Sequence, residues 1–320
     1  MAILVTGAAG FIGFHVATAL LARGDTVMGL DNLNDYYDVR LKHARLDQLT
    51  PHKNFSLIKA DVADVQAIQS MFAQHGQNIS GIIHLAAQAG VRYSLINPYA
   101  YITSNITGTL TLLEAARHMP TPPRFVYASS SSVYGSNTKT PFSVHDAVDH
   151  PVSLYAASKR ADELMAETYA HLFKLPLTGL RFFTVYGPWG RPDMAAYLFA
   201  AAMMHGEPIK VFNHGHMARD FTYIDDIVAG ILAAHDRQTT GHKVYNLGNN
   251  HPENLLDFIA MLEEALGVEA KRELLPMQAG DVPATFADIT DSEKDLGFAP
   301  KTNLRAGIAR FVAWFKAYHA

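Results

Sequence analysis

The sequence predicts an α/β protein: a doubly wound parallel sheet followed by a smaller α/β domain. Two observations support this fold class. Short apolar segments alternate with segments of helical spacing through the first 180 residues, and the first apolar segment, residues 2–6, runs into a glycine-rich turn. Apolar runs of this kind are typical of parallel strands covered by helices on both faces. Ligands bind such a sheet at the carboxyl ends of its strands, so we expect the functional residues there.

The expected elements follow one another along the whole chain. Strands are predicted at residues 2–6, 25–31, 55–60, 82–87, 124–128, 177–182 and 243–247. Helices are predicted at residues 14–23, 65–72, 101–118, 154–172, 195–205 and 255–266, with one ending at 234 and a closing helix through 304–315. Residues 32–54 are polar and predict a loop plus an exposed helix. The alternation becomes irregular after residue 182, which predicts domains at residues 1–180 and 181–320, with some later segments returning to the first domain.

Composition excludes several classes of function. The chain has 26 basic and 30 acidic residues, so no overall attraction to nucleic acid or to membranes is expected. It has no cysteine, hence no disulfide and no thiolate nucleophile or ligand, which suits a reducing cytoplasm. No apolar run approaches the roughly 20 residues that span a bilayer, and the first residues resemble a strand rather than a signal peptide. His214 and His216 have no carboxylate placed to complete a set of ligands, so no metal is expected.

The glycine-rich turn contains Gly7, Gly10 and Gly13 between a strand and a helix. Glycines let backbone amides approach a pyrophosphate closely, and the start of the helix offers free N–H groups and a positive dipole. The next strand ends at Asp31, within about 20 residues of the last glycine, where a carboxylate can bind both hydroxyls of an adenosine ribose and repel a 2'-phosphate. This pattern predicts NAD rather than NADP. After the following strand, a side chain at residues 61–62 could meet the adenine.

A tyrosine and a lysine one helical turn apart form the candidate catalytic pair. Tyr155 and Lys159 share a helix face, so the Lys159 ammonium can favour the ionised form of the Tyr155 phenol. Such a tyrosine can act as a general acid and base. Ser130 and Ser131 follow the fifth predicted strand, at the same rim of the sheet as the glycine turn, where they could hydrogen-bond a substrate hydroxyl. His84 ends a buried strand and is interpreted as structural.

Eight segments together resemble a known family. TGAAGFIG (6–13), SSSSVYG (129–135), YAASK (155–159) and RDFTYIDD (219–226) resemble the extended short-chain dehydrogenase/reductase superfamily, whose members modify nucleotide sugars. DNLNDYYD (31–38), HLAAQAGVRYS (84–94), RFFTVYGPWGRPDM (181–194) and PMQAGDVPATFAD (276–288) resemble more narrowly the UDP-glucuronate 4-epimerases, enzymes of polysaccharide biosynthesis. The resemblance runs nearly end to end and implies a Rossmann-type first domain that binds NAD and a second domain that binds the nucleotide sugar.

The resemblance also implies roles for particular residues. The catalytic residues would be Tyr155 as base, Lys159 as its partner, and Ser130 and Ser131 at the reacting hydroxyl. The NAD-binding residues would be Gly7, Gly10, Phe11, Ile12, Gly13, Asp31, Asn32, Asp61, Val62, Leu85, Ala86, Ala87, Tyr155 and Lys159. The substrate-binding residues would be Arg92, Ser130, Ser131, Ser132, Thr184, Arg191, Arg219, Gln278 and Asp281. Among these, Thr184 and the arginines would meet the sugar carboxylate and the diphosphate, and Gln278 and Asp281 the uridine ribose.

The implied reaction converts UDP-glucuronate into UDP-galacturonate through a 4-keto sugar, with transient reduction of bound NAD+. Three alternatives stay open. One is a UDP-glucuronate decarboxylase, although such enzymes usually carry Glu where this chain has Ser132. Another is a 4-epimerase of UDP-N-acetylglucosamine, its uronate or UDP-glucose, although Thr184 stands where the neutral-sugar enzymes usually have Asn. The third is a non-catalytic NAD-binding sensor. A homodimer packed through residues 101–118 and 154–172 is also expected.

Overall fold

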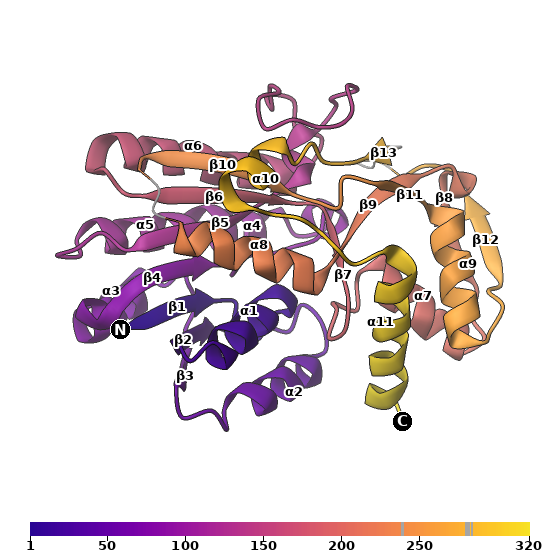
Figure 1. Ribbon diagram of the computed structural model, residues 1–320, viewed down its shortest axis with the longest axis horizontal. Coiled ribbons are helices and arrows are strands. Elements are labelled where there is room, and N and C mark those ends of the chain that lie inside the picture. The colour runs from indigo at the N-terminus through magenta and orange to yellow at the C-terminus, as the bar shows by residue number, and fades with distance from the viewer. Residues whose placement is uncertain (238–239, 279–281, 283) are drawn as a thin grey trace.

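The computed structural model describes residues 1–237, 240–278, 282 and 284–320. Its largest element is a seven-stranded parallel sheet with the strand order β10-β6-β5-β4-β1-β2-β3 (Figure 1). The strands are β1 (Ala2–Thr6), β2 (Thr26–Asp31), β3 (Phe55–Lys59), β4 (Ile79–His84), β5 (Arg124–Ser130), β6 (Leu177–Phe182) and β10 (His242–Leu247). The predicted parallel sheet is therefore confirmed.

Helices cover both faces of this sheet (Figure 1). One face carries α1 (Phe11–Ala22), α2 (Val39–Leu49) and α8 (Ile224–Asp236), and the other carries α3 (Val65–His75), α5 (Gly108–Arg117) and α6 (Leu154–Phe173). Successive residues of a strand point to opposite faces, so Ile3 and Val5 enter one core while Ala2 and Leu4 enter the other. Burial on both faces explains why β1 is apolar throughout.

The strand order reverses beside β1. The chain leaves β1 for β2 and β3 on one side and then crosses back to β4 on the other. In an open α/β sheet the crevice at such a reversal, outside the carboxyl ends of the strands, is where ligands bind. The glycine turn after β1 and the serines at the end of β5 both lie at this edge of the sheet.

A second group of elements lies beyond this edge (Figure 1). A small sheet contains β7 (Thr184–Tyr186), β9 (Ala218–Tyr223), β11 (Pro252–Asn254) and β13 (Ala284–Thr285), and β8 (Ile209–Phe212) pairs with β12 (Arg272–Leu275). The helices of this group are α7 (Ala195–Met204), α9 (Leu255–Leu266) and α11 (Leu304–Tyr318). Strand β10, helix α8 and the short α10 (Thr290–Leu296) instead return to the large sheet.

The expectation of an exposed helix within residues 32–54 is wrong. Helix α2 buries Leu41, Leu46 and Leu49, and it also buries the charged side chains of Lys42 and Arg45. Arg45 is fully buried because backbone carbonyls from distant segments accept its hydrogen bonds, which offsets the cost of removing the guanidinium from water. Sequence composition does not reveal partners of this kind.

Candidate functional site

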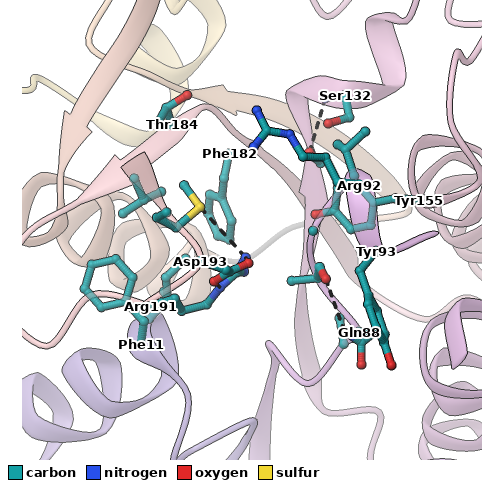
Figure 2. A pocket seen from close by; sticks show the side chains of 18 of the residues that line it. Phe11, Gln88, Arg92, Tyr93, Ser132, Tyr155, Phe182, Thr184, Arg191 and Asp193 are labelled. Carbon is teal, nitrogen blue, oxygen red and sulfur yellow. Dashed lines mark hydrogen bonds and ion pairs between the residues drawn. The ribbon is translucent and has the colours of Figure 1, made fainter. Parts of the chain in front are cut away.

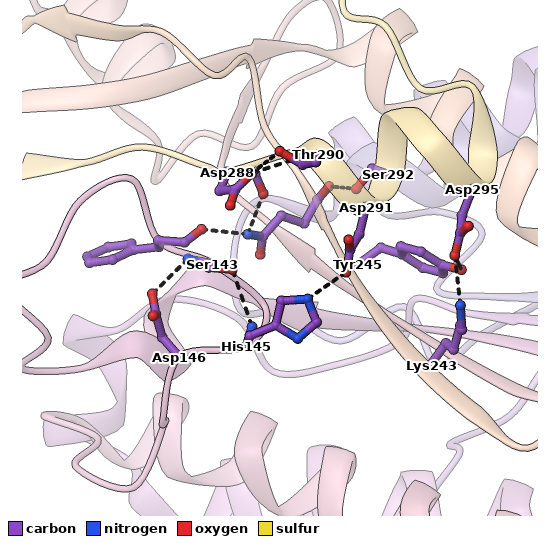
Figure 3. Close-up of polar contacts among 12 residues, drawn as sticks. Ser143, His145, Asp146, Lys243, Tyr245, Asp288, Thr290, Asp291, Ser292 and Asp295 are labelled. Atoms are coloured by element: carbon purple, nitrogen blue, oxygen red, sulfur yellow. Dashed lines mark hydrogen bonds and ion pairs between the residues drawn. The ribbon is translucent and has the colours of Figure 1, made fainter.

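A cavity of about 1010 Å³ lies between the large sheet and the second group of elements. Every predicted site residue that the structure describes lines it; Asp281 lies outside the described residues. Figure 2 shows its two walls, with Tyr155, Tyr93 and Ser132 on one side and Thr184, Arg191 and Asp193 on the other. The cavity is therefore large enough to hold both a dinucleotide and a second ligand.

The glycine turn at the base of the cavity has no room for side chains. Gly7 has φ +70°, and a Cβ there would lie 2.8 Å from the backbone nitrogen of Ala86. A Cβ on Gly13 would lie 2.0 Å from the carbonyl oxygen of Gly7. Among the residues described, no side chain caps the start of α1 at Gly10. The first amides of α1 can therefore serve a pyrophosphate, so the turn fits the dinucleotide that its sequence predicts.

Two carboxylates stabilise the loops that follow β2 and β3, next to the glycine turn. Asp31, at the end of β2, accepts hydrogen bonds from the backbone N–H of Ala9 at 3.0 Å and of Leu33 at 2.8 Å. The Asn32 amide donates to Asp61 at 2.8 Å. These bonds tie the ends of β2 and β3 to the glycine turn and fix both carboxylates at the cavity wall.

Tyr155 enters the cavity from the first turn of α6. The hydroxyl of Ser153 accepts a hydrogen bond from the Ala156 N–H at 3.1 Å and so defines where the helix begins. The Tyr101 ring packs edge-on against Tyr155 with 6.0 Å between the ring centroids. Lys159 lies one turn further along α6, and its side chain is 3% exposed.

The serine run divides into two roles. Ser129 uses its hydroxyl within the protein, where it donates to Glu163 at 2.6 Å. Ser130 caps the short helix η4 (Ser131–Tyr134) by accepting from the Ser132 N–H at 3.2 Å. A hydroxyl that accepts one bond can still donate its own proton. Ser130, Ser131 and Ser132 therefore present polar groups to the cavity.

A buried ion pair supports the serines from behind. Arg181 on β6 donates twice to Glu163, at 2.8 and 2.9 Å, and both side chains are almost fully buried. Burial by itself would raise the pKa of Glu163, but the Arg181 guanidinium outweighs it and holds that pKa below its usual value. Arg181 also lies over the Tyr134 ring. The pair joins β5, β6 and α6 beneath the catalytic candidates.

The predicted cations lie at different points of the cavity. Arg191 forms a bidentate ion pair with Asp193, at 2.9 and 2.6 Å, and Tyr36 donates to the same carboxylate at 3.1 Å. Burial would lower the pKa of Arg191, but Asp193 more than offsets this and raises it. The guanidinium carbon of Arg92 lies 4.9 Å from the centroid of the Phe212 ring. Arg219 donates a hydrogen bond to the backbone carbonyl of Ala218. Arg191 therefore offers a guanidinium already oriented by a carboxylate.

Sequence reasoning missed Asn105, a buried residue in the π-helical stretch η3 (Ile102–Thr107). Its amide donates to the Gln88 carbonyl at 3.1 Å and to Ser158 at 2.9 Å, and the Ser158 hydroxyl donates to the Tyr155 carbonyl at 2.8 Å. Asn105 thus ties the Tyr155 turn to the loop after β4. The available signal was an Asn inside a predicted helix, where this residue type is unfavourable without a specific partner.

The part of the chain that the structure describes contains neither a candidate metal site nor a candidate membrane span. Within residues 1–237, 240–278, 282 and 284–320, no three His, Cys, Asp or Glu side chains form a group that could hold a metal ion. In the same ranges no helix combines the length and apolar character needed to cross a membrane.

Comparisons with known proteins agree with this site. The model of the NAD dependent epimerase/dehydratase family matches residues 3–248. UDP-glucuronate 4-epimerase 4 of Arabidopsis thaliana is 49% identical, over 99% of this chain and 76% of its own length. An uncharacterized 37.6 kDa protein of Escherichia coli O111:H- is 51% identical over 100% of this chain and 99% of its own. The structure of UDP-glucuronic acid 4-epimerase from Bacillus cereus, in complex with UDP-glucuronic acid and NAD, superposes with a TM-score of 0.92 at 35% identity, covering 99% of this chain and 100% of that one. This chain belongs to the NAD dependent epimerase/dehydratase family.

Proposed function

We propose that this protein is a UDP-glucuronate 4-epimerase that interconverts UDP-glucuronate and UDP-galacturonate. The observation that carries the proposal is the convergence of Tyr155, Ser130 and Thr184 on the cavity that also contains the glycine turn. Relatives in Arabidopsis thaliana and Bacillus cereus that are UDP-glucuronate 4-epimerases support this choice of substrate.

The residues at the base of the cavity would hold NAD. The glycine turn and the first amides of α1 suit its pyrophosphate, Asp31 suits the adenosine ribose, and we propose that Asp61 and Val62, which also line the cavity, contact the adenine. Solved relatives in complex with NAD support this cofactor. When bound, NAD supplies the acceptor and donor for hydride at carbon 4 of the sugar.

Tyr155 would handle the proton. Its phenolate removes the proton of the 4-hydroxyl as carbon 4 becomes a ketone, and the phenol returns that proton to the oxygen when the ketone is reduced on its other face. Lys159 favours the phenolate by its charge, and Ser130 and Ser131 orient the reacting hydroxyl. The proton balance over one cycle is zero, as an isomerisation requires.

The carboxylate of the sugar must be held in a fixed orientation, because the 4-keto sugar is a β-keto acid and can lose carbon dioxide. Carbon dioxide leaves readily when the bond to the carboxyl lies parallel to the carbonyl π system. We propose that Thr184 and Ser132 hold this bond away from that alignment, with Arg92, Arg191 and Arg219 serving the carboxylate and the diphosphate. Gln278 lines the cavity where it could meet the uridine ribose, and Asp281 is proposed for the same contact.

The test is proton NMR of the purified protein with UDP-glucuronate and no added cofactor. We expect UDP-galacturonate to accumulate toward an equilibrium mixture, which would establish epimerisation and bound NAD together. A pentose nucleotide would identify a decarboxylase. No change would direct the assay to UDP-N-acetylglucosamine, its uronate and UDP-glucose, and a failure with all of them would favour an NAD-binding sensor.

We propose that two copies pack through α5 and α6. Helices α5 and α6 pack side by side, and their Leu110, Leu164 and Leu172 are 38%, 53% and 60% exposed, so a partner that covers these helices would bury apolar side chains. The variant Leu164→Glu with Leu172→Glu should run as a monomer in light scattering after gel filtration. Leu274→Glu, on β12 at the far end of the molecule (Figure 1), should behave as the wild type. A wild-type monomer would contradict the proposal.

The division into an NAD-binding part at residues 1–180 and a sugar-binding part at 181–320 is likewise proposed, with β10 and α8 as the segments that return. The cysteine-free composition supports work in the cytoplasm.

A further inference from the structure

A buried carboxylate lies directly behind Lys159. The Lys159 ammonium nitrogen is 3.2 Å from Oδ2 of Asp162, and the two side chains are 3% and 1% exposed. Among the described residues, Oδ1 of Asp162 has no hydrogen-bond partner. Removing a charged carboxylate from water costs free energy, and more so when one of its oxygens has no hydrogen-bond donor. The ion pair with Lys159 is therefore the interaction that stabilises the charged form of Asp162.

Among the residues that the structure describes, Lys159 is the cation that pairs with Asp162. Glu163 on the same helix is paired with Arg181 and adds negative charge. Tyr127 on β5 and Thr109 on α5 are neutral hydroxyls. His84 on β4 is buried among hydroxyls, and burial followed by the charge of Lys159 lowers its pKa to about 3, so it is also neutral.

Lys159 contacts Asp162 and follows Tyr155 by one turn of α6, and both Lys159 and Tyr155 line the cavity. In the proposed reaction the Lys159 charge would therefore be shared between the Asp162 carboxylate and the Tyr155 phenol. An ammonium whose charge is partly neutralised favours the phenolate less strongly. A phenolate that is less strongly favoured is also a stronger base.

We propose that Asp162 is a positioning residue that holds the Lys159 ammonium and partly neutralises it, which keeps Tyr155 a stronger base than an unopposed lysine would allow. This inference rests on the proposed function, because it assumes that Tyr155 exchanges the proton and that Lys159 tunes it. Burial raises the pKa of Asp162 to about 6 against the opposing effect of Lys159, so its charge changes within an accessible pH range.

The first test is the pH profile of Asp162→Asn, which keeps the shape and removes the charge. With UDP-glucuronate as substrate, the acidic limb of kcat/KM should move to lower pH by about one unit, because Tyr155 ionises more easily beside an unopposed lysine. The plateau of kcat should fall several-fold, because the phenolate is a weaker base. Glu167→Gln is the matched control: it removes one charge from the exposed side of the same helix and should leave the profile unchanged.

Asp162→Glu separates charge from shape. It keeps the negative charge, so its acidic limb should stay near that of the wild type. A profile of Asp162→Asn that superimposes on the wild type would overturn the proposal, as would equal shifts in the Asn and Glu variants.

A second measurement leaves residue 162 unchanged. In protein labelled with ¹³C at the tyrosine Cζ, the Tyr155 resonance is assigned by its loss in Tyr155→Phe. We expect this resonance to show a second, smaller inflection near pH 6, where Asp162 takes up its proton. Its absence would contradict the coupling. This titration needs no turnover, so it distinguishes a failure of the present inference from a failure of the proposed epimerase activity.

Discussion

At the scale of single residues, the Tyr155 hydroxyl carries the proposed chemistry. Tyr155→Phe removes that one oxygen and leaves the ring that packs against Tyr101. We expect conversion of UDP-glucuronate, measured by NMR, to fall by about 10²–10⁴-fold while the NAD content and the melting temperature stay the same. Tyr99→Phe is the matched control, since its ring is 80% exposed. Unchanged turnover in Tyr155→Phe would refute the role of general base.

The glycine turn allows a second prediction at this scale. In Gly13→Ala the new methyl group would meet the Gly7 carbonyl, which is backbone and cannot rotate away. We expect loss of bound NAD, measured by absorbance after denaturation, and a lower melting temperature. Gly76→Ala places its methyl 3.7 Å from the nearest atom, in helical backbone, and should change neither property. If Gly13→Ala retained NAD, the turn would accommodate the methyl group without loss of binding, which would contradict the prediction.

At the scale of elements, Arg45 joins three segments. From α2 it donates to the Ala9 carbonyl at 2.8 Å, to the Tyr37 hydroxyl at 2.7 Å and to the Trp189 carbonyl at 2.6 Å. It thereby ties the glycine turn to the loop that leads to Arg191. Burial lowers the pKa of Arg45, and hydrogen bonds from several sides make that burial tolerable.

Arg45→Lys should break this brace, because an ammonium cannot reach both carbonyls at once. We expect the free energy of unfolding in urea to fall by about 1–3 kcal/mol, together with weaker retention of NAD. Arg40→Lys is the control on the same helix, where the side chain is 85% exposed and pairs with Asp38. Equal behaviour of the two variants would mean that Arg45 only fills space.

At the scale of the whole molecule, the half-buried His15 and the buried His84 predict loss of stability in mild acid. Burial lowers the pKa of His15 to about 4 and that of His84 to about 3, while the unfolded chain protonates histidine near pH 6.5. Below about pH 6.5 these histidines take up protons in the unfolded state but stay neutral in the folded state. The free energy of unfolding therefore falls as the pH drops from about 6.5 toward 4. Asp162, whose pKa is raised to about 6, has the opposite effect on stability. Between pH 6 and its unfolded pKa near 4, the folded state takes up the proton before the unfolded state does, so this group adds stability as the pH drops.

Urea midpoints at pH 7 and pH 5 test this prediction. We expect a lower midpoint at pH 5 and a smaller pH dependence in His15→Gln, which cannot take up a proton. His52→Gln replaces an exposed histidine and should retain the wild-type dependence. A midpoint that does not change between the two pH values would contradict the assignment.

Much of the fold is local and therefore readable from the sequence. Apolar runs such as that of β1 determine a strand buried on both faces, and the spacing of Gly7, Gly10 and Gly13 determines a tight turn before a helix. Tyr155 and Lys159 are four residues apart, so a helix alone brings them to one face. These features involve neighbours in the chain, and periodicity is sufficient to predict them.

Only the tertiary structure decided how distant segments meet. It returns β10 to the large sheet, buries Arg45 against carbonyls of two remote loops and brings Asn105 to the Tyr155 turn. The sequence by itself determined the parallel sheet, the glycine turn and the tyrosine–lysine pair. The burial of polar and charged side chains was decided by the tertiary structure, because its cost is offset by partners that chain folding, and not sequence proximity, supplies.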